Sequence, residues 1–296
     1  EQTVFSKLKR NNNYLFTYAW QDINKEKQSF EFLVPKKAVF SRFRTFKRYK
    51  ANMAAEFLLF SLRKHYRDNP IDNVQLSFSE QNGNIQTKIS GSSELAINNA
   101  YKAVAALEQQ FTQQYLDENY YHLFTLHNGK KGIKPNHVKI ANESVNDLKS
   151  IKPVILEKVA AKNIRKVTNF ILGFVQNVPY ETLQSRATSS GAGFNTPLRL
   201  LWENKGDCDS KVTLTVALLR ALMPRIKMVL IFIDNHAVFG IDLPAENNEV
   251  SIMYDGVSYL VADPTGPALM NVGQLSPSTK NIILSGNYSI EPFIAL

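Results

Sequence analysis

Hydrophobic and polar residues alternate with two different periods in the first half of the chain. Short runs of aromatic and β-branched residues predict strands, and apolar residues that recur every three or four positions predict helices. Asn82-Gly83 favours a hairpin turn, and Ser92-Ser93 can cap a helix. The predicted order is a hairpin (14–20 and 29–34), a helix (36–67), a hairpin (74–78 and 85–89), a helix (94–124) and an exposed loop (127–136).

The second half changes from helical to strand periodicity. A helix is predicted from residue 144 to residue 175 with a kink at Pro153, and a Ser-, Thr- and Gly-rich stretch (184–195) predicts a mobile loop. An apolar helix follows Cys208, and Asp255-Gly256 is a tight turn between two of the later strand signals. Those strands are predicted at 228–233, 236–243, 250–254 and 257–261. The pattern predicts an α+β fold, with an N-terminal α+β domain (1–143) and a second domain (144–296).

Length and composition agree with two packed domains. The chain has 296 residues, of which 44% are hydrophobic, so it can fill more than one core. No apolar run reaches the ~20 residues that a membrane-spanning helix needs. The chain begins at Glu1 rather than Met, which fits a processed export signal. We therefore expect a periplasmic or secreted protein, and otherwise a cytoplasmic one.

The positive charge is concentrated near the N-terminus. The formal net charge is +9, and residues 1–70 contain 15 Lys and Arg against 6 Asp and Glu. Residues 36–50 contain seven of these cations and no acid, and Phe40, Phe43 and Phe46 lie between the charges. One interpretation is an amphipathic helix with a solvated basic face. The other is a docking surface for an acidic partner such as anionic lipid or a wall polymer. No nucleic-acid-binding motif is present, so we do not predict nucleic acid as a partner.

Cys208 is the only cysteine of the chain, and it follows Gly206-Asp207 at the predicted start of the apolar helix. A helix N-terminus carries partial positive charge and free N–H groups, which favour a thiolate. A thiol nucleophile also needs a base and a group that orients the base. His236 and Asp263 follow at intervals of 28 and 27 residues, on two predicted strands. We therefore predict that Cys208, His236 and Asp263 converge.

Six runs in this order resemble the transglutaminase-like superfamily of cysteine enzymes, over about a third of the chain. The resemblance implies a papain-like core, in which a helix that carries the nucleophile packs on an antiparallel sheet. Two positions depart from the pattern: Asp209-Ser210 stands where many relatives have Glu-Asp, and Met223-Pro224 stands where glycine is common. The runs are residues 174–180, residues 197–201, Gly206-Asp207-Cys208-Asp209, residues 214–222, His236-Ala237-Val238 and residues 259–265.

The resemblance implies a role for each residue of the predicted triad. Cys208 would be the nucleophile, His236 the general base and acid, and Asp263 the group that orients the imidazole. The backbone N–H of Cys208 is the first candidate donor to an oxyanion. The indole N–H of Trp202 is a candidate second donor, with packing under the helix as the alternative. Tyr180 either lines the cleft or simply ends its helix. Asp207 is a helix-start carboxylate or a residue that shapes the pocket.

Three functions are compatible with these features. The first is a cysteine hydrolase that cleaves an amide in a protein, a peptide or a peptide-bearing wall polymer through a thioester on Cys208. The second is an acyltransferase that resolves the same thioester with an amine, as in cross-linking, or carries out deamidation. The third is a binding protein that uses the basic segment 36–50. We favour the hydrolase, and we predict neither a cofactor nor a metal, because no Cys and His cluster has zinc spacing and no calcium-loop pattern is present.

Overall fold

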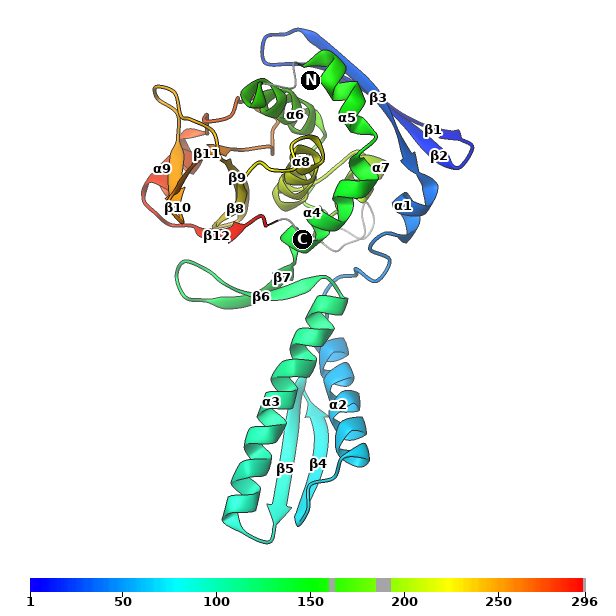
Figure 1. Cartoon of the computed structure of the whole chain (residues 1–296), viewed down its shortest axis with the longest axis vertical. Coiled ribbons are helices and arrows are strands. Elements are labelled where there is room, and N and C mark those ends of the chain that lie inside the picture. The colour runs from blue at the N-terminus through cyan, green and yellow to red at the C-terminus, as the bar shows by residue number, and fades with distance from the viewer. Residues whose placement is uncertain (160–162, 185–192, 295–296) are drawn as a thin grey trace. The chain divides into compact units, whose positions relative to one another are not determined.

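The computed structural model describes residues 1–159, 163–184 and 193–294. The fold is α+β with antiparallel sheets, as the sequence predicts, and the chain divides into two compact units (Figure 1). The first unit contains residues 1–44, 124–132 and 136–296, and the second contains residues 45–123 and 133–135. The predicted boundary at residue 143 is therefore wrong, because the second unit is an insertion between segments of the first.

A five-stranded antiparallel sheet is the centre of the first unit. Its order is β10-β11-β9-β8-β12, and apolar residues of β8 point alternately into a core on either face. Since both faces are covered, β8 is apolar at every position, as buried strands are. The strands are β8 (Met228–Ile233), β9 (His236–Ile241), β10 (Ser251–Tyr254), β11 (Val257–Ala262) and β12 (Ser289–Pro292). The first four confirm the predicted strands to within three residues at each end.

Helix α8 (Cys208–Leu222) packs against β9 and is buried from Ser210 to its last residue. Helices α4, α6 and α7 pack around it, so α8 is the core helix of the unit (Figure 1). Helix α9 contributes Ile283 to the core on the opposite face of the sheet. The remaining helices are α4 (His137–Ser144), the 3-10 helix η1 (Val145–Leu148), α5 (Ile151–Lys158), α6 (Ile164–Asn177), α7 (Pro197–Glu203) and α9 (Pro277–Leu284). The predicted helix 144–175 is therefore several helices, with Pro153 in the first turn of α5, where proline is tolerated.

A second antiparallel sheet explains why the N-terminal residues belong to this unit. It consists of β1 (Gln2–Arg10), β2 (Asn13–Gln21) and β3 (Lys27–Pro35), of which β1 was not predicted because most of its side chains are exposed. The Tyr18 ring meets Phe174 of α6 edge to face at 4.8 Å, and the Tyr18 hydroxyl donates to the Leu201 carbonyl at 2.9 Å. These aromatic side chains share one core with α6 and α8.

The second unit is a hairpin packed on two helices. Leu62, Tyr66, Phe78 and Val104 form its buried core. The elements are α2 (Ala51–Asp68), β4 (Val74–Gln81), β5 (Asn84–Gly91) and α3 (Glu94–Glu118). The predicted hairpin is confirmed. The helix predicted to reach residue 124 is too long, because α3 ends at Glu118 and β6 (Tyr121–Thr125) follows. Strand β6 pairs with β7 (Lys131–Pro135), which lies inside the predicted loop.

The basic segment 36–50 is not one helix. Helix α1 (Lys36–Ser41) ends before Phe43, a buried residue with φ +57°, and α2 begins at Ala51. A positive φ is incompatible with continuing an α-helix. Arg42 pairs with Asp147 at 2.7 Å, and the segment is divided between the two units after residue 44. The first interpretation, a single amphipathic helix with one solvated basic face, is therefore wrong for this segment.

No helix in residues 1–159, 163–184 or 193–294 combines the length and the apolar character needed to cross a bilayer. Most of the loop predicted to be mobile, residues 185–192, lies outside the described residues.

Candidate active site

The turn before α8 places Cys208 at the first helical position. The Asp207 side chain caps the helix by accepting from the Ser210 backbone N–H at 3.0 Å, and it also accepts from the Ser210 hydroxyl. A Cβ atom at Gly206 would come within 2.6 Å of the Leu200 side chain, so a larger residue here would require the buried Leu200 to move. The Cys208 N–H is one of the helix-start groups without a partner inside the helix, which makes it available to an oxyanion.

His236 and Asp263 meet across neighbouring strands. His236 is the first residue of β9, and Asp263 follows the last residue of β11, which pairs with β9. The Nε2 atom of His236 lies 2.8 Å from Oδ2 of Asp263. This hydrogen bond holds the proton on Nε2 and leaves Nδ1 with a free lone pair. The predicted pairing of these two residues is therefore present in the structure.

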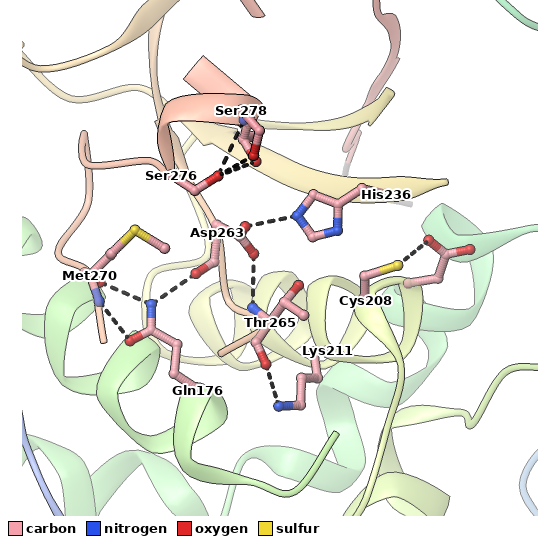
Figure 2. Close-up of polar contacts among 11 residues, drawn as sticks. Gln176, Cys208, Lys211, His236, Asp263, Thr265, Met270, Ser276 and Ser278 are labelled. Atoms are coloured by element: carbon pink, nitrogen blue, oxygen red, sulfur yellow. Dashed lines mark hydrogen bonds and ion pairs between the residues drawn. The ribbon is translucent and has the colours of Figure 1, made fainter. Parts of the chain in front are cut away.

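The thiol of Cys208 lies next to the start of β9. The backbone N–H of Ala237 acts on its sulfur and lowers the pKa of the thiol, so Cys208 lies near the residue that follows His236. Figure 2 shows the imidazole of His236 between the carboxylate of Asp263 and the thiol of Cys208. The three predicted residues therefore lie at the ends of α8, β9 and β11, and among these three described residues the one hydrogen bond joins His236 and Asp263.

The electrostatics of the thiol differ from the prediction. Burial raises the pKa of Cys208, and the charges of Asp209 and Asp207 raise it further. The Ala237 N–H opposes this shift but does not outweigh it. The thiol also donates to Oδ1 of Asp209 at 3.6 Å. The expectation of a preformed thiolate is therefore wrong, because burial and the two neighbouring carboxylates outweigh the helix N-terminus, and the resting group is a neutral thiol.

His236 and Asp263 form a charge-stabilised pair. Burial lowers the pKa of His236, but the hydrogen bond and the charge of Asp263, with a contribution from Asp209, leave it above its ordinary value. Burial raises the pKa of Asp263, but the hydrogen bonds from His236 and Thr265 and the histidine charge leave it below its ordinary value. Asp263 is therefore a carboxylate at neutral pH, and it makes His236 a stronger base.

Asp207 and Tyr180 flank the cysteine turn. Burial and the charge of Asp209 raise the pKa of Asp207 to about 7, and its side chain serves as the helix cap. Tyr180 is 50% exposed and pairs with Gly206 through an isolated β-bridge. Burial and the charges of Cys208, Asp207 and Asp209 raise the Tyr180 pKa. Tyr180 therefore lies near the thiol, and its interpretation as a cleft residue stays a prediction.

Trp202 takes part in aromatic packing. Its ring contacts Tyr14, Phe16 and Phe40, with centroid distances of 4.8, 6.4 and 5.1 Å. The Lys7 ammonium lies over the same ring, 3.9 Å from its centroid. These contacts are typical of a packing role, which was the alternative to its interpretation as an oxyanion donor.

Two buried polar side chains near Asp263 were missed by the sequence analysis. Nε2 of Gln176, on α6, donates to the carbonyl oxygens of Asp263 at 2.8 Å and Met270 at 2.9 Å (Figure 2). Lys211, on α8, donates to the carbonyl oxygen of Thr265. Within a buried helix, a lone Lys or Gln that interrupts an apolar pattern was the available signal.

A second histidine, His137, adjoins the cysteine turn. It is fully buried on α4, and its Nδ1 lies 3.0 Å from the Thr213 hydroxyl. Its Nε2 lies 3.8 Å from Oδ2 of Asp209, the carboxylate beside the thiol. His137 is therefore a core residue that adjoins the site.

Within the part of the chain that the structure describes, no three His, Cys, Asp or Glu side chains are arranged to hold a metal ion. A scan against protein-family models, a search of curated proteins and a search of solved structures each gave no match. The resemblance to the transglutaminase-like superfamily therefore stays a prediction, carried by the sequence runs described above.

Proposed function

We propose that the protein is a cysteine-dependent enzyme that cleaves amide bonds through a thioester on Cys208. The observation that carries this proposal is the 2.8 Å hydrogen bond from His236 Nε2 to Asp263, with the imidazole between that carboxylate and the thiol. A base oriented by a buried carboxylate beside a thiol is the arrangement that nucleophilic catalysis requires.

The raised pKa of Cys208 favours general-base activation over a stored thiolate. In the first step, Nδ1 of His236 takes the thiol proton while sulfur attacks the amide carbonyl, and the Cys208 N–H stabilises the oxyanion. The C–N bond then breaks, and the imidazolium gives its proton to the leaving amine. Water attacks the thioester in the second step, with His236 again taking a proton, which releases a carboxylic acid and restores the thiol.

The arrangement of elements also supports a papain-like core. Helix α8 begins at the nucleophile and packs on β9, the strand that carries His236, and β11 next to it leads to Asp263. With the resemblance in sequence, this favours a protein, a peptide or a peptide-bearing wall polymer as the substrate.

An activated ester tests the proposed nucleophile without knowledge of the natural substrate. We expect p-nitrophenyl acetate to acetylate the wild-type protein at Cys208, with release of p-nitrophenolate and a peptide map that assigns the acetyl group. Cys208→Ala should lose this reaction, and His236→Ala should lose at least roughly 10²-fold in rate, because it removes general-base catalysis. Acetylation that is equally fast in His236→Ala, or absent from Cys208 in the wild type, would contradict the proposal.

The fate of the thioester separates hydrolysis from transfer. The acetylated protein is mixed with a large excess of a primary amine such as cadaverine, and the products are identified by mass spectrometry. Acetate as the main product supports the hydrolase, whereas acetylated cadaverine supports an acyltransferase. A second test incubates the protein with dimethylcasein and cadaverine. New peptide termini would support the hydrolase, and cadaverine incorporated into the casein would support the acyltransferase.

A further inference from the structure

A buried lysine lies one helical turn after the proposed nucleophile. The Lys211 side chain is fully buried on α8, and its Nζ donates to the Val178 carbonyl at 2.5 Å. It also donates to the Thr265 carbonyl (Figure 2). Val178 follows the end of α6, and Thr265 lies two residues after Asp263. One ammonium group therefore joins three segments of the site: α6, α8 and the turn that carries Asp263.

The Thr265 contact leads directly to the carboxylate of Asp263. The Thr265 backbone N–H donates to Oδ1 of Asp263 at 2.9 Å, and Oδ2 of the same carboxylate lies 2.8 Å from His236 Nε2. The two oxygens thus have different partners, and the orientation of the carboxylate depends on where Thr265 sits. Lys211 holds Thr265 through its carbonyl group, so a hydrogen-bonded path runs from Lys211 to His236.

Burial of a lysine is costly, which argues against a role in packing alone. Burial lowers the pKa of Lys211 to about 8, and the charges of Asp263 and Asp207 oppose this shift. Replacing a buried charge by an apolar side chain of similar size is often neutral or stabilising. A side chain that only filled this space would not need an ammonium group.

We propose that Lys211 is a positioning residue, which fixes the turn 263–265 so that Asp263 holds the imidazole of His236 toward Cys208. This inference rests on the proposed function for its catalytic meaning, but the positioning itself can be measured in the unliganded protein. Without the ammonium group, the turn loses its anchor to α8 and α6, and the pair of Asp263 and His236 loosens.

The test compares Lys211→Met with a matched control on the same helix. Arg220 is also a buried cation of α8, and its guanidinium donates to the carbonyls of Pro224 at 2.6 Å and Phe293 at 2.7 Å. Arg220→Met therefore removes a cation that holds two carbonyls at the other end of α8. Lys211→Gln keeps an amide donor and serves as a second variant if Lys211→Met does not fold.

The first readout is the pKa of His236 in each variant. It is measured from the pH dependence of the imidazole NMR signals in the absence of any substrate. In Lys211→Met we expect the His236 pKa to fall toward its ordinary value, because its bond with Asp263 weakens, with a smaller fall in Lys211→Gln. In Arg220→Met it should stay where it is in the wild type. A His236 pKa that is unchanged or raised in folded Lys211→Met would overturn the proposal.

The second readout is acetylation of Cys208 by p-nitrophenyl acetate. We expect Lys211→Met to lose about tenfold or more in rate at a pH where His236 is neutral, since misplacement by about 1 Å can cost 10²-fold. Arg220→Met should react at the wild-type rate. If His236 responds to Lys211 but the wild type is not acetylated, the proposed function fails and the positioning role stands. If the wild type is acetylated and Lys211→Met keeps its rate, the positioning role fails.

Discussion

The carboxylate of Asp209 offers a direct test of the charge balance around the thiol. Its Oδ1 lies 3.6 Å from Sγ of Cys208, and its side chain is 34% exposed. Because a third of the group is in solvent, its charge is screened, and we take an effective dielectric constant of about 40. Coulomb's law then gives about 2 kcal/mol against the thiolate, which corresponds to a roughly 30-fold smaller thiolate fraction.

Asp209→Asn removes this charge with little change in shape. We expect the thiolate fraction at a fixed pH below the thiol pKa to rise by roughly 30-fold. The thiolate of a more acidic thiol is a weaker nucleophile. With a Brønsted coefficient of about 0.5, the rate constant of the thiolate falls roughly fivefold. The net expectation is therefore about a fivefold faster reaction with 4,4′-dithiodipyridine, an uncharged disulfide whose release of thiopyridone is followed by absorbance.

The matched control is Asp255→Asn, which makes the same substitution in the β10–β11 turn. Asp255 has φ +48°, a conformation that asparagine tolerates, so the control should fold and react as the wild type does. Circular dichroism establishes that each variant is folded. If folded Asp209→Asn reacts no faster than the wild type, the charge of Asp209 does not suppress the thiolate, and the part of the raised Cys208 pKa that is assigned to Asp209 is wrong.

Two further predictions follow from the other carboxylates of the site. Because Asp263 holds the His236 pKa above its ordinary value, Cys208 acetylation should rise with pH through that pKa, and Asp263→Asn should move the rise to lower pH and slow the reaction roughly 10³-fold. The pH profile with p-nitrophenyl acetate measures both effects, and an unmoved profile would show that another group orients His236. The folded-state pKa of Asp207 is raised to about 7, so the protonated form stabilises the fold, and this contribution is lost as pH rises from about 4 to about 7, by about 1.4 kcal/mol per pH unit. Asparagine is an equally good cap and does not titrate. The free energy of unfolding of Asp207→Asn in urea, relative to that of the wild type, should therefore be larger at pH 8 than at pH 5. The same difference between variant and wild type at both pH values would contradict the assigned burial.

The fold was predictable where the signal is local. The hairpin of β4 and β5 was found because Asn82-Gly83 marks its turn, and β8 was found because burial on both faces makes it a continuous apolar run. The division into units was not predictable, because it depends on contacts such as that of Tyr18 with Phe174, 156 residues apart in the chain. Periodicity reports that a side chain is buried, but it does not report which segment covers it.

The helix breaks were missed for a related reason. The apolar spacing continues through Phe43, but the backbone there has a positive φ, and the buried ring is held by tertiary packing. The same holds after α3, where Tyr120 has φ +62° and the chain turns into β6. Neither position has glycine or proline, the residues by which a sequence usually marks such a break.

The placement of the site residues was easier to predict than their protonation states. Spacing placed His236 and Asp263 on neighbouring strands, and their hydrogen bond agrees with that prediction. The charge state of Cys208 did not follow from its place at a helix start, because a helix N-terminus contributes about half a charge, whereas Asp207 and Asp209 each carry a whole one when ionised. Their positions, and that of the buried Lys211, depend on tertiary packing. A sequence can therefore identify the groups that exchange a proton, while the side chains around them decide which group holds it at rest. Here the burial and the two carboxylates leave the proton on sulfur, so in the proposed mechanism His236 takes it as the substrate is attacked.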